Sequence, residues 1–493
     1  MRRRSPSGLV LTALTVSCLI GGIAETQAAD PVGKDYWPQW RGPLATGVAP
    51  SADPPAEWSE TKNVKWKVKL PGHGASTPVI WDNMVLIHAA ISVETKPAAN
   101  EEATQGDAAS EDVKAEDAKA EDAKADGARP QQDRPRPDRE RPGGSGRGGP
   151  GGRGGFGSVP PTQPYRFVAM AIDRQTGKTI WQKTLKEELP HEGHHRDHGY
   201  SSFSPVTDGK RIVSYFGSRG LYCLDMAGNV QWSKELGKMK TRAGFGEGSS
   251  PALYGNAIVV NWDHEGDDFI AAFNVETGDE LWRNERDEPT SWSTPLVVEH
   301  DGRPQVITSA TNRVCGYDLA SGTLLWECSG LTTNAIPSPV YADGVVYATT
   351  GYRGSALLAI KLGQTGDLTD TDSVLWKLER NTPYVPSPLL YGNRLYLFKS
   401  NDATLSCFDA TTGKVLIDQV RLSGLRGAYA SPVGAGDKVY LVGRNGTSMV
   451  IKNADKLETL ATNELDEPID ASPAAVGKEL FLRGHDSLYC IAE

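Results

Sequence analysis

Four of the nine histidines lie within eight residues, in the segment His191-Glu192-Gly193-His194-His195-Arg196-Asp197-His198. Imidazole and carboxylate groups are ligands for zinc and copper, and a loop can wrap an ion without helical spacing. The spacing matches no metalloenzyme signature such as H-E-x-x-H. The sequence therefore leaves two hypotheses. One is a metal site made of His191, His194, His195, His198 and Asp197, and the other is a polar connector whose histidines hydrogen-bond neighbouring loops.

A second group of polar and aromatic residues stands just before recurring Ser-Pro or Thr-Pro pairs. These residues are Glu247, Trp292, Asn334, Tyr384, Tyr429 and Asp470. Carboxylate and amide oxygens bind calcium, and a Trp can lie under a flat cofactor. If the six residues surround one axis, they form either such a site or a polar, water-filled channel.

The Ser-Pro and Thr-Pro pairs indicate which elements position these side chains. The pairs are Thr77-Pro78, Ser204-Pro205, Ser250-Pro251, Thr294-Pro295, Ser338-Pro339, Ser387-Pro388, Ser431-Pro432 and Ser472-Pro473. Once a 72-residue insert is subtracted, their spacing is about 45 residues, which is typical of propeller blades. Each period contains a turn, an alternating strand, a strand that ends near an Asp-Gly turn, and a further strand that often carries Trp. Four short strands per period predict an all-β, eight-bladed β-propeller of four-stranded antiparallel blades over residues 64–493.

The two ends of the chain predict how the ring closes. The final period stops at Glu493 after three strands, and an extra strand, Val64-Lys65-Trp66-Lys67-Val68, precedes the first period. We expect this N-terminal strand to complete the last blade, because closure leaves no open sheet edge. The tryptophans expected to pack between neighbouring blades are Trp66, Trp181, Trp232, Trp282, Trp326 and Trp376.

Two segments are expected to lie outside the folded ring. Residues 1–28 combine early arginines, an apolar run and small residues, which is typical of a cleaved secretory signal. Residues 92–163, rich first in Ala, Glu, Asp and Lys and then in Arg, Pro and Gly, predict a disordered insert within blade 1. Residues 29–63 form an N-terminal extension. We expect an exported protein, periplasmic or extracellular, and lipid attachment at Cys18 is the less favoured alternative.

Composition excludes some partners. The net charge of -10 gives no overall positive field for nucleic acid, and no segment after the signal has the roughly 20 apolar residues of a spanning helix.

We expect a monomer. The five cysteines after the signal are scattered and odd in number, which argues against a disulfide framework.

The sequence resembles the PQQ-like β-propeller repeat family, which includes quinoprotein alcohol dehydrogenases and BamB-like outer-membrane assembly proteins. The resemblance rests on the Ser-Pro strand starts and on units such as Asp173-Arg174-Gln175-Thr176-Gly177-Lys178-Thr179-Ile180-Trp181. The opening Trp37-Pro38-Gln39-Trp40-Arg41-Gly42-Pro43 also resembles the start of a large group of exported bacterial propellers.

The resemblance implies two functions from different classes. If the protein is a quinoprotein with PQQ and calcium acting on an alcohol or sugar, strand position, rather than a matched active-site motif, makes Glu247 and Asn334 the metal ligands, Trp292 the stacking floor and Asp470 the base. The adjacent cysteine pair typical of such enzymes is absent from the sequence. We therefore favour a non-catalytic scaffold, with no required cofactor, that binds a protein, peptide or envelope polymer. The enzyme remains the alternative.

The loops predict which face binds. In a propeller, the connectors into the innermost strands and the loops between second and third strands share one face. These segments are polar here, and they include the histidine-rich connector and the start of the insert. We call this the loop-rich face and expect it to bind the partner, although surface loops are polar in most proteins.

Overall fold

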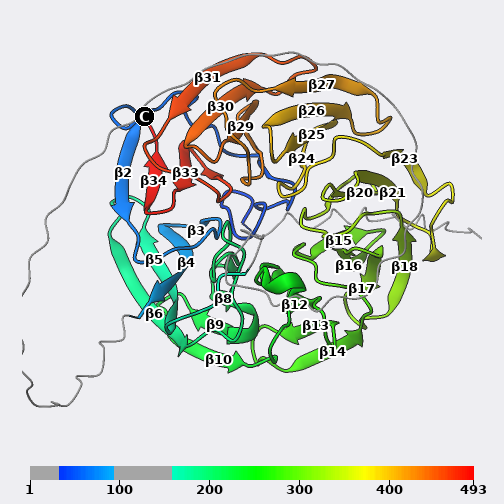
Figure 1. The fold of residues 1–493 in the computed structure, drawn as a ribbon, viewed down its shortest axis with the longest axis horizontal. Helices are drawn as coiled ribbons and strands as arrows, with labels where there is room; N and C mark the ends of the chain where they lie inside the picture. The colour runs from blue at the N-terminus through cyan, green and yellow to red at the C-terminus, as the bar shows by residue number, and fades with distance from the viewer. Residues whose placement is uncertain (1–32, 94–157) are drawn as a thin grey trace, which may run out of the picture.

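A computed structural model describes residues 33–93 and 158–493. Within these residues, 34 strands form eight sheets around a central axis, which confirms the predicted propeller (Figure 1). The predicted signal, 1–28, lies outside the described residues, as does most of the predicted insert, 92–163. The described flanks of the insert meet the rest of the chain where Val159 pairs with His194.

The first four blades, from the axis outward, have the following strands. Blade 1 has β3 (Val79–Trp81), β4 (Met84–Ser92), β5 (Tyr165–Asp173) and β6 (Thr179–Glu188), and blade 2 has β7 (Val206–Thr207), β8 (Arg211–Tyr215), β9 (Leu221–Asp225) and β10 (Val230–Lys234). Blade 3 has β11 (Ala252–Tyr254), β12 (Ala257–Trp262), β13 (Phe269–Asn274) and β14 (Glu280–Glu285). Blade 4 has β15 (Leu296–His300), β16 (Arg303–Ser309), β17 (Arg313–Asp318) and β18 (Leu324–Ser329), with β22 (Gly366–Asp367) added outside β18.

The other four blades follow the same order. They are β19 (Val340–Ala342), β20 (Val345–Thr350), β21 (Ala356–Lys361) and β23 (Val374–Leu378); β24 (Leu389–Tyr391), β25 (Arg394–Lys399), β26 (Thr404–Asp409) and β27 (Val415–Arg421); β28 (Val433–Ala435), β29 (Lys438–Val442), β30 (Thr447–Lys452) and β31 (Thr459–Glu464), with β1 (Val48–Ala49) on the axial side of β28; and β32 (Ala474–Val476), β33 (Glu479–Arg483), β34 (Ser487–Ile491) and β2 (Val64–Lys69). Two short 3-10 helices, Gly217–Arg219 and Arg242–Gly244, lie in loops.

The ring closes as predicted. Strand β2 pairs antiparallel with β34, so the N-terminal strand is the outermost strand of the eighth blade. The five cysteines in the described residues are buried and free, in agreement with the absence of a disulfide framework.

In blades 1, 2, 3, 4 and 6, a tight turn between the third and fourth strands contacts a tryptophan of the preceding blade. In blade 1 the Asp173 carboxylate accepts the backbone N–H groups of Gln175 and Thr176, and Gly177 takes a positive φ of 70°. A Cβ at Gly177 would lie 2.8 Å from the Trp66 ring. Glycine is therefore needed at this turn both for its backbone conformation and for the close approach of the indole.

Five of the six predicted inter-blade tryptophans pack on such a turn. The indole N–H groups of Trp66, Trp181, Trp232, Trp282 and Trp376 donate to the carbonyls of Arg174, Met226, Val275, Leu319 and Ala410 of the next blade, at 2.7 to 3.0 Å. Each indole thus contributes apolar contact and one hydrogen bond across a blade boundary.

Trp326 was predicted to pack between blades, but its hydrogen-bond partner lies in its own blade. Its indole donates to Gln305 and packs on Gly316, both within its own blade. The next blade replaces the tight turn by a longer segment, 362–373, which contains β22, so no glycine turn is present to receive the ring. Trp326 still lies in the apolar cluster that blades 4 and 5 share.

The described part of the predicted extension, residues 33–63, packs against the ring. Residues 37–49, which we call the axial plug, cross the axis at the face of the tight turns, here the turn-rich face (Figure 1). Trp37 pairs with Ile80 of blade 1, and β1 pairs in parallel with β28 of blade 7. Arg41 is buried, and its guanidinium donates to the carbonyls of Pro388 and Pro432, each at 2.8 Å.

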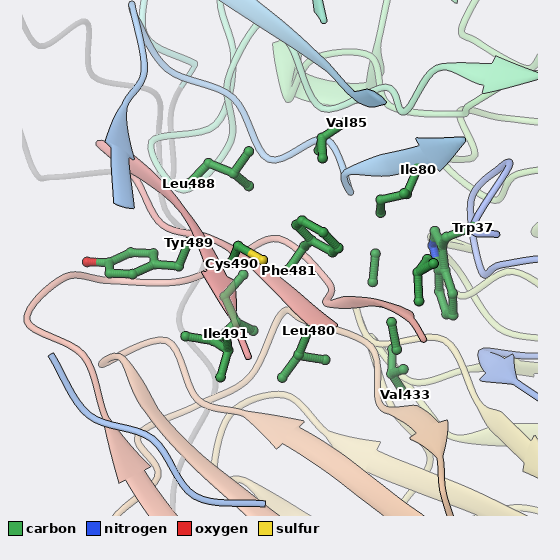
Figure 2. Close-up of a cluster of buried hydrophobic side chains, with 14 of the residues drawn as sticks. Trp37, Ile80, Val85, Val433, Leu480, Phe481, Leu488, Tyr489, Cys490 and Ile491 are labelled. Atoms are coloured by element: carbon green, nitrogen blue, oxygen red, sulfur yellow. The ribbon is translucent and has the colours of Figure 1, made fainter. Parts of the chain in front are cut away.

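The largest apolar cluster joins the plug to the closing blades. Trp37 is fully buried in the same cluster as Ile80, Val433 and Phe481, which belong to blades 1, 7 and 8 (Figure 2). A single core therefore packs the N-terminal segment against the seam where the ring closes. Burial of this surface favours the closed ring.

The Ser-Pro and Thr-Pro pairs form a belt of hydrogen bonds around the axis. The backbone N–H of each Ser or Thr donates to the hydroxyl of the equivalent residue in the next blade, at 2.8 to 3.2 Å, from Thr77 through Ser204, Ser250, Thr294, Ser338, Ser387 and Ser431 to Ser472. At the closing step, the Thr77 hydroxyl is buried with no partner in the described residues. Proline after each hydroxyl residue removes an N–H that the innermost strand does not need.

Candidate functional site

A cavity of about 630 Å³ lies on the axis at the loop-rich face. Its wall comes from the connectors into the innermost strands and from loops between second and third strands, the segments predicted to share one face. The lining includes His195, His198, Phe245, Trp292, Tyr352, Tyr384, Asn401, Tyr429, Arg444 and Asp470. Cavities of this size, with aromatic walls and a few polar groups, are typical of ligand sites.

The floor of the cavity is formed by the plug and the hydroxyl belt. Trp40 lines the cavity, and its indole N–H donates to the Ser338 hydroxyl at 3.0 Å. Ser250, Ser387, Ser431 and other belt residues also line it. The cavity therefore has a wall of aromatic and charged side chains above a ring of hydroxyl groups.

Four of the six residues predicted to surround the axis do line the cavity. They are Trp292, Tyr384, Tyr429 and Asp470. The other two, Glu247 and Asn334, are buried and absent from its lining.

Glu247 is held by neighbouring loops. One carboxylate oxygen accepts from Arg219 at 2.6 Å, and the other accepts the backbone N–H of Ser218 at 2.6 Å. A Cβ at Gly217 would lie 1.8 Å from the second oxygen, so glycine leaves the room in which this carboxylate sits. Glu247 therefore fixes the loop between β8 and β9 rather than facing the cavity.

Asn334 has a positive φ of 64°, which Asn tolerates better than most residues. Its side-chain oxygen and nitrogen are buried and have no hydrogen-bond partner in the described residues. Its backbone N–H donates to the Thr311 hydroxyl at 3.2 Å. The positive φ favours Asn at this position, and its role as a metal ligand stays a prediction.

Asp470 belongs to a network of charges at the cavity wall. Its carboxylate accepts from Nε of Arg444 at 2.7 Å and from Nη2 at 3.2 Å, and it lies 3.1 Å from Nε2 of His485. Burial raises the pKa of Asp470, but the bonds from His485 and Arg444 outweigh burial and the pKa falls below its ordinary value. The bond to Asp470 raises the pKa of His485.

These contacts test whether the site fits calcium with a quinone cofactor. Both candidate carboxylates, Glu247 and Asp470, are already paired with arginines, and a cation at either must displace a guanidinium. Asp470 as a base is held in its ionised form by Arg444 and His485, which makes it a weaker proton acceptor. The Trp292 indole does face the cavity, but the donor set as folded does not fit a calcium ion.

The four histidines of the connector have separate partners. Nε2 of His191 contacts the Met239 carbonyl at 2.7 Å, whereas Nδ1 of His194 contacts the His195 carbonyl at 2.8 Å. Nδ1 of His195 accepts the backbone N–H of Asp197 at 3.2 Å.

His198 lies between the Glu247 carbonyl, 3.1 Å from Nε2, and the Ser202 hydroxyl, 2.9 Å from Nδ1. Burial lowers its pKa to about 4. In the described part of the chain, no group of three or more His, Cys, Asp or Glu side chains is arranged to hold a metal. The geometry matches the polar-connector hypothesis, and the metal site stays a prediction.

Several cavity residues were not predicted from the sequence. Tyr352 stacks with Tyr384, with ring centroids 4.9 Å apart, and the guanidinium of Arg444 lies 3.9 Å from the centroid of the Tyr429 ring. Trp40 belongs to a recognised motif, but its place at the axis depends on how the extension folds back. The polarity of the Asn401 and Arg444 loops was a signal, whereas Tyr352 carries no repeat pattern.

The comparisons with known proteins agree with this geometry. A family model described as outer membrane protein assembly factor BamB matches residues 166–419. The outer membrane protein assembly factor BamB of Yersinia pestis is 26% identical over 255 residues, which cover 48% of this chain and 58% of that protein. The chain thus matches less than two thirds of the length of this relative.

Solved structures with low sequence identity show the same fold. Quinohemoprotein alcohol dehydrogenase from Comamonas testosteroni is 10% identical with a TM-score of 0.57, covering 94% of this chain and 81% of that one. A europium-containing methanol dehydrogenase is 8% identical with a TM-score of 0.57, covering 93% and 98%. At these identities the likeness concerns the fold alone.

No helix formed by the described residues is both long and apolar enough to cross a membrane.

The family model covers just over half of the sequence, and the residues that it matches lie in the blades of the ring. The chain therefore belongs to the PQQ-like β-propeller family whose model is described as outer membrane protein assembly factor BamB.

Proposed function

We propose that this propeller is a non-catalytic binding module of the cell envelope that takes part in the assembly of outer-membrane proteins. The function follows the name of its relative from Yersinia pestis, and the axial cavity supports it. A deep, aromatic-walled cavity that is closed from behind by the plug suits the capture of a side chain or segment of a partner.

The observation that carries the proposal is that the carboxylates in and beside the cavity are paired with arginines. Asp470 and Asp197 each lie within ion-pair distance of Arg444, and Glu247 pairs with Arg219. Carboxylates used in this way position loops, and they are poor metal ligands and poor bases. The cavity is thus better suited to recognition than to oxidation of an alcohol.

The test uses the chain from residue 29 onward and an unfolded outer-membrane β-barrel protein kept soluble in urea, then diluted. We expect saturable binding, measured by the change in tryptophan fluorescence. Trp292→Ala with Tyr429→Ala should weaken it, because both side chains line the cavity. Lys178→Ala with Lys414→Ala is the matched control, since both lysines are exposed in turns on the turn-rich face.

Binding that is equal in the cavity variant and the control variant would place the contact elsewhere and contradict the proposal. The same preparations should be titrated with PQQ and calcium. Saturable PQQ binding that requires calcium and is lost in Glu247→Ala would favour the quinoprotein alternative instead.

A further inference from the structure

The charges that line the axial cavity are unevenly paired. Its two carboxylates, Asp197 and Asp470, both lie within ion-pair distance of Arg444. Arg196 also lines the cavity and is exposed, yet it forms no ion pair with any described residue. The two acids of the wall thus share one guanidinium, and Arg196 adds a second positive charge to the lining.

A second cavity, of about 370 Å³, adjoins the first and shares Tyr429 and Arg444 with it. Arg421 and Arg426 line this side cavity, are exposed, and form no ion pair within the described residues. The one carboxylate in its lining, Asp402, lies 3.4 Å from Nζ of Lys399. The side cavity is thus a cationic recess on a chain whose net charge is -10.

Two further arginines extend this positive rim. Arg353 is exposed and lies 5.4 Å from the ring of Tyr352, a cavity residue. Arg242 is half-buried and close enough to Tyr384 to lower the pKa of that hydroxyl, although burial raises it more. Neither arginine forms an ion pair with a described residue.

The aromatic wall lies directly beside these arginines. Trp292 and the stacked pair Tyr352 and Tyr384 face the axial cavity, and Tyr429 separates it from the side cavity. Guanidinium groups bind carboxylates through two parallel hydrogen bonds, whereas the aromatic wall takes apolar or aromatic groups. A fitting ligand therefore carries carboxylates next to a bulky apolar group.

We propose that the loop-rich face binds an acidic polypeptide segment that places carboxylates on the arginines of the rim and an aromatic side chain in the axial cavity. This inference rests on the proposed function and names the class of partner. A polypeptide is favoured over an acidic polysaccharide because a sugar polymer has no aromatic side chain to fill a cavity of about 630 Å³.

The experiment measures fluorescence anisotropy with two labelled peptides, one that alternates Glu and Phe and one that alternates Gln and Phe. The chain from residue 29 onward should bind the acidic peptide roughly tenfold more tightly, and added salt should reduce the difference. Arg421→Glu with Arg426→Glu should lose this preference. Lys178→Glu with Lys414→Glu makes the same change in net charge on the turn-rich face and should keep it.

The other possible results show whether the charge inference or the proposed function fails. If both peptides bind equally and Trp292→Ala weakens both, the charge inference fails and the proposed function stands. If neither peptide binds while the unfolded outer-membrane protein still does, the inference fails and the proposed function stands. Equal losses in the two charge-reversed variants, or tighter binding of polygalacturonate than of the acidic peptide, would also overturn the inference. Near-ultraviolet circular dichroism checks that each variant is folded.

Discussion

At the turn-rich end of the axis, the channel is closed by Trp37, Trp40 and Arg41, whose contacts are apolar surface, backbone carbonyls and one hydroxyl group. At the loop-rich end, the cavity is open, and Arg444 and Asp470 form ion pairs that line it. The same ring of strands supports both ends. Their side chains differ, because the turn-rich end is packed into the core and the loop-rich end lines an open cavity.

The charged groups at the two ends have different partners. Burial lowers the pKa of Arg41 to about 9, and no carboxylate contributes to that shift. Arg41 therefore stays protonated at neutral pH and serves as a donor to carbonyls of two blades. Arg444 has carboxylate partners, which raise its pKa although burial acts in the opposite direction. A buried donor with backbone partners locks a segment, whereas partly exposed ion pairs can exchange partners.

The largest expected effect is a difference in unfolding free energy between variants at the two ends of the axis. Trp37→Ala removes a fully buried indole from the cluster at the closing seam, and it should cost about 3–5 kcal/mol of unfolding free energy. Trp292→Ala, in the half-buried cavity wall, should cost about 1 kcal/mol while weakening partner binding. Guanidinium denaturation of both variants provides the measurement. Equal losses would mean that the two ends contribute alike to stability.

A pH effect should arise at the loop-rich end. Glu288 is buried, its backbone lies in the connector to blade 4, and burial raises its pKa to about 7. Since the pKa is lower in the unfolded chain, ionisation favours unfolding as pH rises from about 4.5 towards 7. Below this window the protonated group carries no such penalty, and above it the penalty is constant.

Glu288→Gln should remove this dependence. The unfolding free energy of the parent relative to the variant should fall by about 2–3 kcal/mol between pH 4.5 and pH 8. Denaturation curves at several pH values measure it. Parallel pH profiles for the two proteins would show that Glu288 does not titrate in this range.

A smaller effect is expected at the blade-to-blade contacts of the turn-rich face. Gly413 has a φ of 70°, and a Cβ there would lie 2.7 Å from the Trp376 ring. Gly392 has a φ of 58° but open space around the same position. Both alanine substitutions strain the backbone, and Gly413→Ala should cost about 1–3 kcal/mol more because the indole must move. Identical midpoints of thermal unfolding would contradict this role of the glycine.

The smallest effect tests the hydroxyl belt between the two ends. Thr294→Val removes the acceptor of the Ser250 N–H, leaving a buried donor unpaired, and should cost about 1–2 kcal/mol. Thr77→Val removes a buried hydroxyl that has no partner in the described residues, so it should be neutral or slightly stabilising. Thermal unfolding compares the two, and a larger loss in Thr77→Val would reveal a contact at the seam.

Much of the fold could be predicted because each blade repeats a local rule. The Ser-Pro and Thr-Pro pairs, the Asp and Gly turn and the strand tryptophan follow one another in fixed order, and local spacing determines them. Trp326 shows the limit of such a rule. Its strand matches the repeat, but the indole depends on a turn in the next blade that the chain replaces by residues 362–373.

Only part of the candidate site could be predicted, because the repeat does not show which residues of different blades contact each other. Position in the repeat correctly placed Trp292, Tyr384, Tyr429 and Asp470 at the cavity, because each stands at the start of an innermost strand. It could not show that Glu247 turns to Arg219, since that ion pair joins residues of two different blades.

Spacing along the chain was enough to predict the number of blades, the closing strand and the face on which the loops gather. Only the folded ring shows which side chains share a cavity, that the Trp37 to Gly42 motif closes the axis, and which arginines lack an ion-pair partner among the described residues. Such features arise from contacts between residues hundreds of positions apart, as between Arg41 and Pro432. Ring closure brings these residues together, and no local sequence pattern predicts their contact.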